Sequence, residues 1–413
     1  MRRLNEMWTA VTLAAGLAMG VSAPVWAHED GEEGGHLIPH HVDGLSVEGG
    51  MTWYLQGTDG LKKGAQPGDA ADLTYTLDLG VSARVTEGTS LNVAFEAGDG
   101  NGVNGRLGSL STANYDAFIT EVSAGQNFPN LSQAYLESKF ADGGVVLEFG
   151  KLDIHSHYDD NAFANDETAQ FLSGIFTRSA GTSYGELDGY YAPGVALTVA
   201  AGSHLTLHGV LANGNGSGFD GVSDRPYAAA QVTLNHCGGE WSEGNVRLYG
   251  IRDARRYLDL NGRQTENIAW GVSVDQALGP VGLFGRYSAQ KDDIQLINKW
   301  DAATATYSIV EPANLVKGAW SGGVQLGGAL WGREADAVGI GYGVVQANGK
   351  NPEWVATAGI ANPDDETHLE VYYSLAVSDH LAFTADVQQI GSNGGDPAAD
   401  AIRIYGVRGQ INF

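Results

Sequence analysis

Apolar and polar residues alternate along most of this chain with the period of two that is typical of β-strands. In residues 72–85, every odd position from Leu73 to Val85 is apolar, whereas the even positions are polar or glycine. The last thirteen residues alternate in the same way and end at Phe413. A strand with one face in lipid and the other in a watery lumen has this pattern. An edge strand of a soluble β-protein also has it, so the rest of the chain must decide.

The pattern recurs often enough to predict about sixteen strands, an even number within the range of bacterial barrels. The predicted spans are 45–55, 72–85, 89–97, 131–140, 144–150, 195–201, 204–212, 226–235, 244–252, 266–277, 280–290, 318–330, 334–345, 366–377, 380–390 and 401–413. Connections after even-numbered strands are mostly short, whereas those after odd-numbered strands are mostly long, the longest being 98–130 and 151–194. Short periplasmic turns and long external loops are typical of outer-membrane barrels. We therefore predict an all-β fold, a transmembrane antiparallel β-barrel over residues 45–413.

The N-terminus indicates export. Arg2 and Arg3 precede a short apolar core, and Val25-Trp26-Ala27 fits the residues that signal peptidase reads before a cleavage site. No later segment approaches the roughly 18 consecutive apolar residues of a transmembrane helix. We expect a signal peptide at residues 1–27 and a periplasmic tail rich in histidine and acidic residues at 28–44.

The composition shows that the chain is strongly acidic. The chain has 49 acidic and 23 basic residues, a formal net charge of −26. This balance argues against nucleic acid as a partner and predicts a negative potential in an enclosed lumen. The 17 tyrosines and 9 tryptophans suit the aromatic girdles of a barrel, and with the single Cys237 no internal disulfide is possible.

The segment GKLDIHSHYDDNAFANDETAQFLSGIF, residues 150–176, carries the most specific motif. Its run from Asn161 to Leu172, with the Asp386-Val387-Gln388 strand and the Gly-Gly-Asp-Pro loop at 394–397, resembles the carbohydrate-selective porin (OprB) family. The resemblance implies an outer-membrane diffusion channel of a Gram-negative bacterium. It further implies sixteen strands, frequent assembly as a homotrimer, and an inward-folded loop that narrows the pore. The expected partners are small hydrophilic solutes such as sugars and ions, outer-membrane lipid, and the barrel-assembly machinery that reads a final strand ending in phenylalanine. No cofactor is expected.

Polar residues of this loop and of the predicted inner face are candidates for the pore constriction. Charges near a pore set its ion selectivity, and Asp and Asn side chains can hydrogen-bond sugar hydroxyls. The candidates are Lys151, Asp153, Asp159, Asp160, Asn161, Asn165, Asp166, Glu167, Arg178, Glu370, Asp386 and Arg408. For Asn161, Asn165 and Asp166, the alternative is that they only cap turns and hold the loop.

His155 and His157 depart from the family pattern. In an extended segment, residues two apart face the same way, so these histidines could share a metal ion with a nearby carboxylate. The alternative is a pair of polar loop histidines without a metal.

We expect a passive porin for small hydrophilic solutes, most naturally carbohydrates, and not an enzyme. GxSxG, HExxH and P-loop motifs are absent from the sequence. The alternative within the channel class is a porin selective for cations or metal ions. An outer-membrane hydrolase, built on His204 and His208, and a binding module that docks a periplasmic partner through the N-terminal histidines are the alternatives from other classes.

Overall fold

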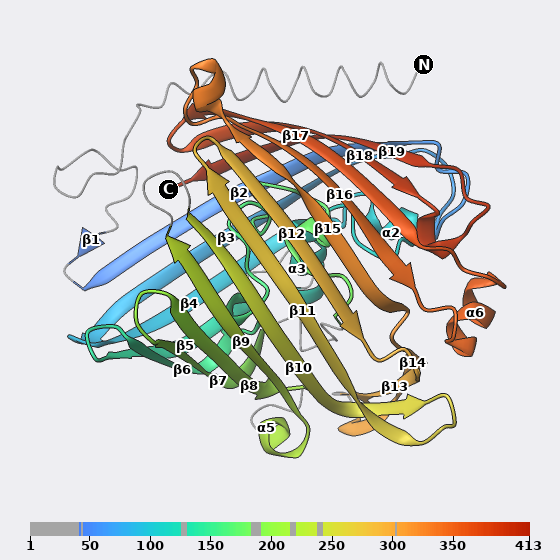
Figure 1. Ribbon diagram of the computed structural model, residues 1–413, viewed down its shortest axis with the longest axis horizontal. Helices are drawn as coiled ribbons and strands as arrows, with labels where there is room; N and C mark the ends of the chain where they lie inside the picture. The colour runs from blue at the N-terminus through green and yellow to red at the C-terminus, as the bar shows by residue number, and fades with distance from the viewer. Residues whose placement is uncertain are drawn as a thin grey trace.

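The computed structural model describes residues 41–42, 44–124, 130–182, 191–214, 220–237, 243–301 and 304–413. Within these residues, sixteen antiparallel strands close into a barrel (Figure 1). The barrel strands are β2 (Leu45–Asp59), β3 (Ala71–Thr86), β4 (Thr89–Asp99), β5 (Asn130–Phe140), β6 (Val145–Asp153), β7 (Tyr191–Ala200), β8 (Leu205–Asn213), β9 (Pro226–Cys237), β10 (Glu243–Asp259), β11 (Gln264–Leu278), β12 (Val281–Gln290), β15 (Val316–Gly327), β16 (Ala337–Ala347), β17 (Glu366–Ser378), β18 (Leu381–Gly391) and β19 (Ile402–Asn412). Each strand pairs with the next, β12 pairs directly with β15, and β19 pairs with β2 to complete the cylinder.

Each of the sixteen predicted spans overlaps one of these strands, although several ends differ by a few residues. The hairpin of β13 (Ile294–Asp301) and β14 (Thr306–Pro312) was not predicted. Its strands are short, and β13 pairs with the end of β10 from Arg256 to Asp259, beyond the barrel wall. β13 pairs with a part of β10 that lies about 40 residues earlier in the chain, so local alternation gave little indication of the hairpin.

Opposite faces of each strand meet different surroundings. On β3, Leu73 is 65% exposed on the outer face, whereas Thr74 is 1% exposed on the inner face. Aromatic residues gather on the outside of neighbouring strands: Tyr287 lies directly opposite Trp320 in the β12–β15 register, and the rings of Trp320 and Tyr342 are 5.7 Å apart. An apolar exterior with aromatic rings is the surface that lipid requires.

The long connections carry short helices, and two of these connections, β4–β5 and β6–β7, fold into the barrel. Together, the long connections contain α2 (Asn104–Leu107), α3 (Tyr115–Ala124), η1 (His155–His157), α4 (Gly174–Thr177), α5 (Asp220–Asp224), α6 (Pro352–Ala358) and η4 (Asn393–Gly395); η3 (Gly328–Trp331) lies in a shorter connection. None of the helices in the described segments is long and apolar enough to cross a membrane.

Segment 98–130 was expected to be an external loop, and the structure corrects this expectation for the residues that it describes, up to Ala124. Its helix α3 packs against the inner faces of β3 and β4, where Asp116 accepts hydrogen bonds from Tyr54 (2.6 Å) and Thr76 (2.6 Å). Leu107 belongs to an apolar cluster with Ile390 and Ile404, which the inner faces of β18 and β19 supply. Long-range contacts of this kind leave no local signal in the sequence.

The chain enters the barrel at the end with the short turns. β1 (His41–Val42) pairs with Leu45 and Ser46 at the start of β2, after a turn at Gly44. The predicted signal peptide at 1–27 and most of the predicted tail at 28–44 lie outside the described residues.

Candidate functional site

The loop between β6 and β7, described from Ile154 to Thr182, follows the inner wall of the barrel. Its contacts run from β8 and β9 through β10, β11 and β12 to β17 and β19. The loop therefore narrows the lumen, as the family resemblance implied. We call this segment the constriction loop.

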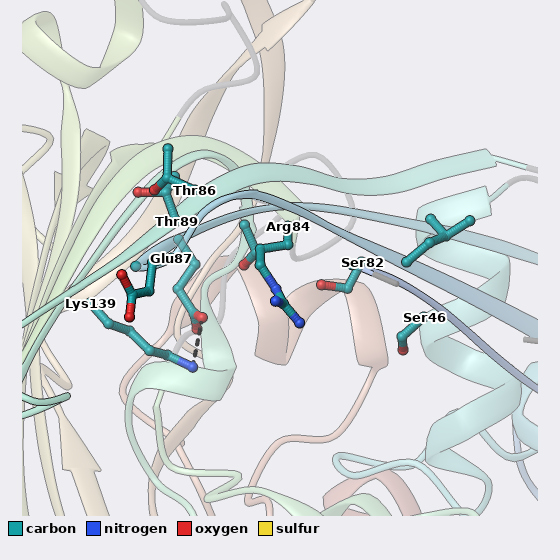
Figure 2. A pocket seen from close by; sticks show the side chains of 12 residues that line it. Ser46, Ser82, Arg84, Thr86, Glu87, Thr89 and Lys139 are labelled. Carbon is teal, nitrogen blue, oxygen red and sulfur yellow. Dashed lines mark ion pairs between the residues drawn. The ribbon is translucent and has the colours of Figure 1, made fainter. Parts of the chain in front are cut away.

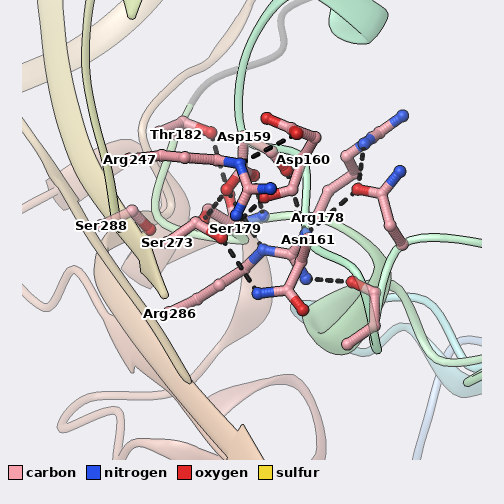
Figure 3. Close-up of polar contacts among 12 residues, drawn as sticks. Asp159, Asp160, Asn161, Arg178, Ser179, Thr182, Arg247, Ser273, Arg286 and Ser288 are labelled. Carbon is pink, nitrogen blue, oxygen red and sulfur yellow. Dashed lines mark hydrogen bonds and ion pairs between the residues drawn. The ribbon is translucent and has the colours of Figure 1, made fainter. Parts of the chain in front are cut away.

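Arg286 on β12 holds the first part of the constriction loop (Figure 3). Its guanidinium donates to the Asp159 carboxylate (3.2 Å) and carbonyl (3.0 Å), to Asn165 Oδ1 (3.1 Å), and to the carbonyls of Ala164 and Phe176. The Asp159 carboxylate also accepts from the backbone N–H (2.6 Å) and the hydroxyl (2.9 Å) of Ser179. Both charged groups of this pair are buried, so Asp159 anchors the loop and does not face the pore.

Arg247 on β10 forms a second anchor beside the first (Figure 3). It binds Asp160 (2.9 Å) and the buried carboxylate of Asp275 on β11. Burial would raise the pKa of Asp160, but Arg247 and Gln231 outweigh it and hold that pKa below its usual value. Asp160 keeps 45% of its side chain exposed, so one face of this anchor borders open lumen.

Asn161, Asn165 and Asp166 take part in turns and anchors of the loop. Asn161 donates to Ser273 Oγ (3.1 Å) and to the Val274 carbonyl (3.0 Å) on β11. Asn165 Oδ1 accepts from Arg178 (2.7 Å). Asp166 Oδ1 accepts from the backbone N–H groups of Thr168 (2.8 Å) and Ala169 (3.1 Å), which is the Asx-turn role that we gave as the alternative.

Arg408 on β19 binds the far end of the constriction loop. It donates to the carbonyls of Glu167 (2.7 Å) and Gln170 (3.0 Å) and to Thr384 Oγ1 (3.2 Å). The side chain of Glu167 lies near that of Asp116 from α3. Burial first, and Asp116 second, raise the pKa of Glu167 to about 8. The two inward-folded segments therefore approach each other here through their carboxyl groups.

Glu370 and Asp386 lie on the inner wall but beneath the loop. Glu370, fully buried, accepts from the backbone N–H groups of Leu172 (2.6 Å) and Ser173 (2.9 Å). Asp386 is buried beside it and accepts from Gln388 (2.9 Å). The sequence analysis placed both carboxylates on the correct face, but in the structure Glu370 holds the loop and Asp386 is buried beside Glu370 and Gln388 on the wall.

Glu366 was missed by the sequence analysis and makes the same kind of contact. It accepts from the backbone N–H groups of Leu110 (2.9 Å), Ser111 (3.1 Å) and Gly394 (2.6 Å), and from His368 Nε2 (2.7 Å). One buried carboxylate thus fixes two connections that lie more than 250 residues apart. Its only sequence signal was its position four residues before Glu370, which places both glutamates on the same face of the strand.

Lys151 and Asp153 lie at the end of β6 with different surroundings. Lys151 lies two and four residues after Phe149 and Leu147, so it shares the outer face on which both are exposed. Its Nζ donates to the Leu131 carbonyl (2.9 Å). This register places Lys151 outside the lumen, so we do not propose it for the constriction. Asp153 Oδ1 accepts from the His155 N–H (2.9 Å), starting the loop.

His155 and His157 do not form the extended pair that a shared metal ion requires. They belong to the 3₁₀-helix η1, whose three residues per turn direct positions two apart to different sides. His157 faces Glu148 on the wall, with Nε2 3.4 Å from the carboxylate. Burial, and then His208, lower the pKa of His157 to about 4. Among the described residues, no three His, Cys, Asp or Glu side chains converge to hold a metal.

Two carboxylate pairs on the inner wall were not singled out from the sequence. Asp78 on β3 lies directly opposite Glu96 on β4, and Glu137 on β5 lies directly opposite Glu148 on β6. Like charges directly opposite each other destabilise a sheet. We call these four residues the acidic wall. The hairpin register could have revealed the second pair, because Glu137 and Glu148 are equally far from the turn between β5 and β6. The first pair depends on a β-bulge near Arg84, which shifts the β3–β4 register by one residue.

The histidines of the hydrolase alternative have other partners. His208 Nδ1 is 3.2 Å from Thr198 Oγ1, and His204 Nδ1 is 3.2 Å from the Asn235 carbonyl. Neither contact supplies a serine or an acid for a catalytic triad.

Comparison with known families identifies the chain. The model of the carbohydrate-selective porin, OprB family, matches residues 62–413, which include the constriction loop. The chain belongs to the carbohydrate-selective porin (OprB) family. As a member it is an outer-membrane porin, and its family and fold are those of a channel. No curated protein matches the chain.

Solved porins share the fold of this family member. The high-pH structure of Pseudomonas putida OprB is 17% identical with a TM-score of 0.70, covering 90% of this chain and 94% of that one. An anion-selective porin from Comamonas acidovorans is 10% identical with a TM-score of 0.52, covering 89% and 99%. The outer-membrane channel DcaP of Acinetobacter baumannii is 11% identical with a TM-score of 0.52, covering 90% and 98%. At these identities the likeness establishes the barrel fold alone.

Proposed function

We propose that this porin lets small neutral sugars and other small hydrophilic solutes diffuse passively through a water-filled, acidic lumen. The observation that carries the proposal is the anchoring of the constriction loop to the inner wall. Arg286 and Glu370 bind it at separate points through buried, charged groups. A loop held in this way is a fixed narrowing that sorts solutes by size.

The chemistry of the lumen suits weak, repeated contacts with polyhydroxyl solutes. The groups that face it include carboxylates, amides and hydroxyls, for example Asp160, Glu148 and Asn245. Conduction requires contacts favourable enough for entry and weak enough for release. A polar wall without one tight site meets that requirement.

The acidic wall favours a modest preference for cations beside sugar passage. Two pairs of carboxylates lie directly opposite each other on neighbouring strands, Asp78 with Glu96 and Glu137 with Glu148, although this arrangement costs stability. Carboxylates around a narrow, low-dielectric channel attract cations. Homotrimer assembly, contact with outer-membrane lipid, insertion by the barrel-assembly machinery and the absence of nucleic acid partners stay predictions.

Sugar-driven swelling of proteoliposomes tests the proposal, with a matched pair of glycine variants. Gly80 on β3 lies on the inner face between Asp78 and Ser82, and an added Cβ there would make only an ordinary contact, 3.9 Å from the Glu48 carbonyl oxygen. Gly250 on β10 lies on the outer face, with nothing within 4 Å of an added Cβ. Gly80→Trp should slow swelling by sugars, and slow larger sugars more, whereas Gly250→Trp should behave as wild type. Equal swelling of all three proteins would contradict solute passage along the inner face of β3.

A further inference from the structure

A cavity of about 290 Å³ opens at the short-turn end of the barrel, away from the anchors of the constriction loop. Residues near the ends of β2, β3, β4 and β5 line it. Figure 2 shows Arg84 between Ser82 on one side and the Lys139 ion pair on the other. Because short turns of outer-membrane barrels are periplasmic, the cavity lies where solutes leave the lumen.

The charges of the cavity balance each other. Arg84 and Lys139 supply two positive groups, and Glu87 and Glu137 supply two negative ones, with Lys139 and Glu137 paired at 2.9 Å. The described residues make no ion pair with Arg84. The chain has a net charge of −26, but in this pocket Lys139 neutralises Glu137, the one acidic-wall residue that lines it, and Arg84 offsets Glu87. The pocket does not select for a charged ligand of either sign.

Hydroxyl groups dominate the remaining lining. They come from Ser46, Ser82, Thr86, Thr89 and Ser90, and none of the described residues that line the cavity is aromatic. Serine and threonine hydroxyls donate and accept, arginine donates in a planar fork, and glutamate accepts. A ligand that satisfies such a mixture carries several hydroxyl groups of its own and no net charge.

The cavity is rigid and small. Its walls are strands tied together by backbone hydrogen bonds, from the Arg84 N–H to the Gly44 carbonyl (2.6 Å) and from the Lys139 N–H to the Gly88 carbonyl (2.8 Å). Its volume lies at the lower end of ligand pockets, which span roughly 300–1,000 Å³. A single sugar ring suits this size better than an oligosaccharide.

We propose that this cavity is a low-affinity exit subsite for one neutral monosaccharide or a polyol of similar size. The inference rests on the proposed function and adds a specific station to it. A solute that has passed the constriction loop exchanges water for Arg84, Ser82 and the Lys139–Glu137 pair before it reaches the periplasm. Several weak stations in series are what conduction by a selective pore needs.

Modulation of single-channel current by D-glucose added to the periplasmic side tests the subsite. Arg84→Met should raise the half-saturating glucose concentration about threefold or more, since hydrogen bonds from a charged donor are lost. Ser82→Ala should raise it in the same direction without changing any charge. The matched control is Arg333→Met, which removes a half-exposed arginine that pairs with Asp336 (2.6 Å) in the turn after β15, outside the cavity. That control should leave the glucose concentration unchanged.

The outcomes separate the subsite from the function. Heat-modifiable mobility and glucose-free conductance would first establish that each variant is folded. An unchanged half-saturating concentration in both Arg84→Met and Ser82→Ala, or no periplasmic modulation of the wild type, overturns the subsite. Glucose-driven swelling of vesicles from the same preparation then decides the function. If glucose enters the vesicles, only the subsite is refuted. If glucose does not enter, sugar passage itself is refuted.

Discussion

Replacing Arg286 with methionine should release the first part of the constriction loop without opening the barrel. Arg286 makes contacts with Asp159, Ala164, Asn165 and Phe176, all within the loop. Methionine fills much of the space but cannot donate, so the buried Asp159 carboxylate loses its positive partner while its contacts to Ser179 remain. Breaking a buried pair by removing one partner costs about 3–5 kcal/mol. Because about 1.4 kcal/mol changes an equilibrium constant tenfold, the equilibrium constant for docking of the loop should fall by about two to four orders of magnitude.

The loss should remain local because other anchors persist. Glu370 still binds Leu172 and Ser173, and Arg408 still binds the Glu167 carbonyl. Single-channel recording should therefore show a larger mean conductance with added current noise, and swelling assays should show less discrimination between glucose and maltotriose.

Two further variants sharpen this prediction. Asp159→Asn combined with Arg286→Met should recover part of the wild-type behaviour, because the unpaired buried charge is removed. Arg252→Met removes an exposed, bidentate pair with Glu266 on the outer face of β10 and should change nothing. Wild-type conductance, noise and sugar ranking in Arg286→Met would refute the anchoring role of this arginine.

Three other outcomes follow from the same structure. Glu137→Gln with Glu148→Gln should lower the cation-to-anion permeability ratio, by about 1 kcal/mol of entry energy per carboxylate at low salt; an unchanged reversal potential would exclude the acidic wall from ion selectivity. Because the pKa of Glu167 is raised to about 8, its carboxyl group is neutral below that pH and becomes charged above it. Cation preference should then rise between pH 7 and pH 9 in the wild type and rise less in Glu167→Gln, and identical pH profiles would contradict this. Phe413→Asp should impair outer-membrane assembly while export continues, since the last strand closes the barrel against β2; normal amounts of heat-modifiable barrel would count against it.

The barrel could be predicted from the sequence because its signal is local. Alternation along 72–85 or 401–413 reflects the lipid on one side of a strand and water on the other, whatever the rest of the chain does. The same parity rule would have placed Lys151 outside, in line with Phe149, had it been applied to the end of β6.

The roles of the candidate residues could not be predicted in the same way. Glu370 accepts from Leu172 and Ser173, almost 200 positions earlier in the chain, so its burial depends on where the loop lies. Asp159 likewise finds its buried partner Arg286 on a strand 127 positions later in the chain. Sequence patterns find charged residues on an inner face, but a folded loop decides which of them still face water.

Uptake of labelled glucose into proteoliposomes that contain the wild-type porin tests the central claim most directly. The account predicts entry well above that of protein-free vesicles, with an initial rate that rises with external concentration and a final internal concentration equal to the external one. No entry above protein-free vesicles, or accumulation beyond the external concentration, would contradict passive diffusion of sugar through this barrel.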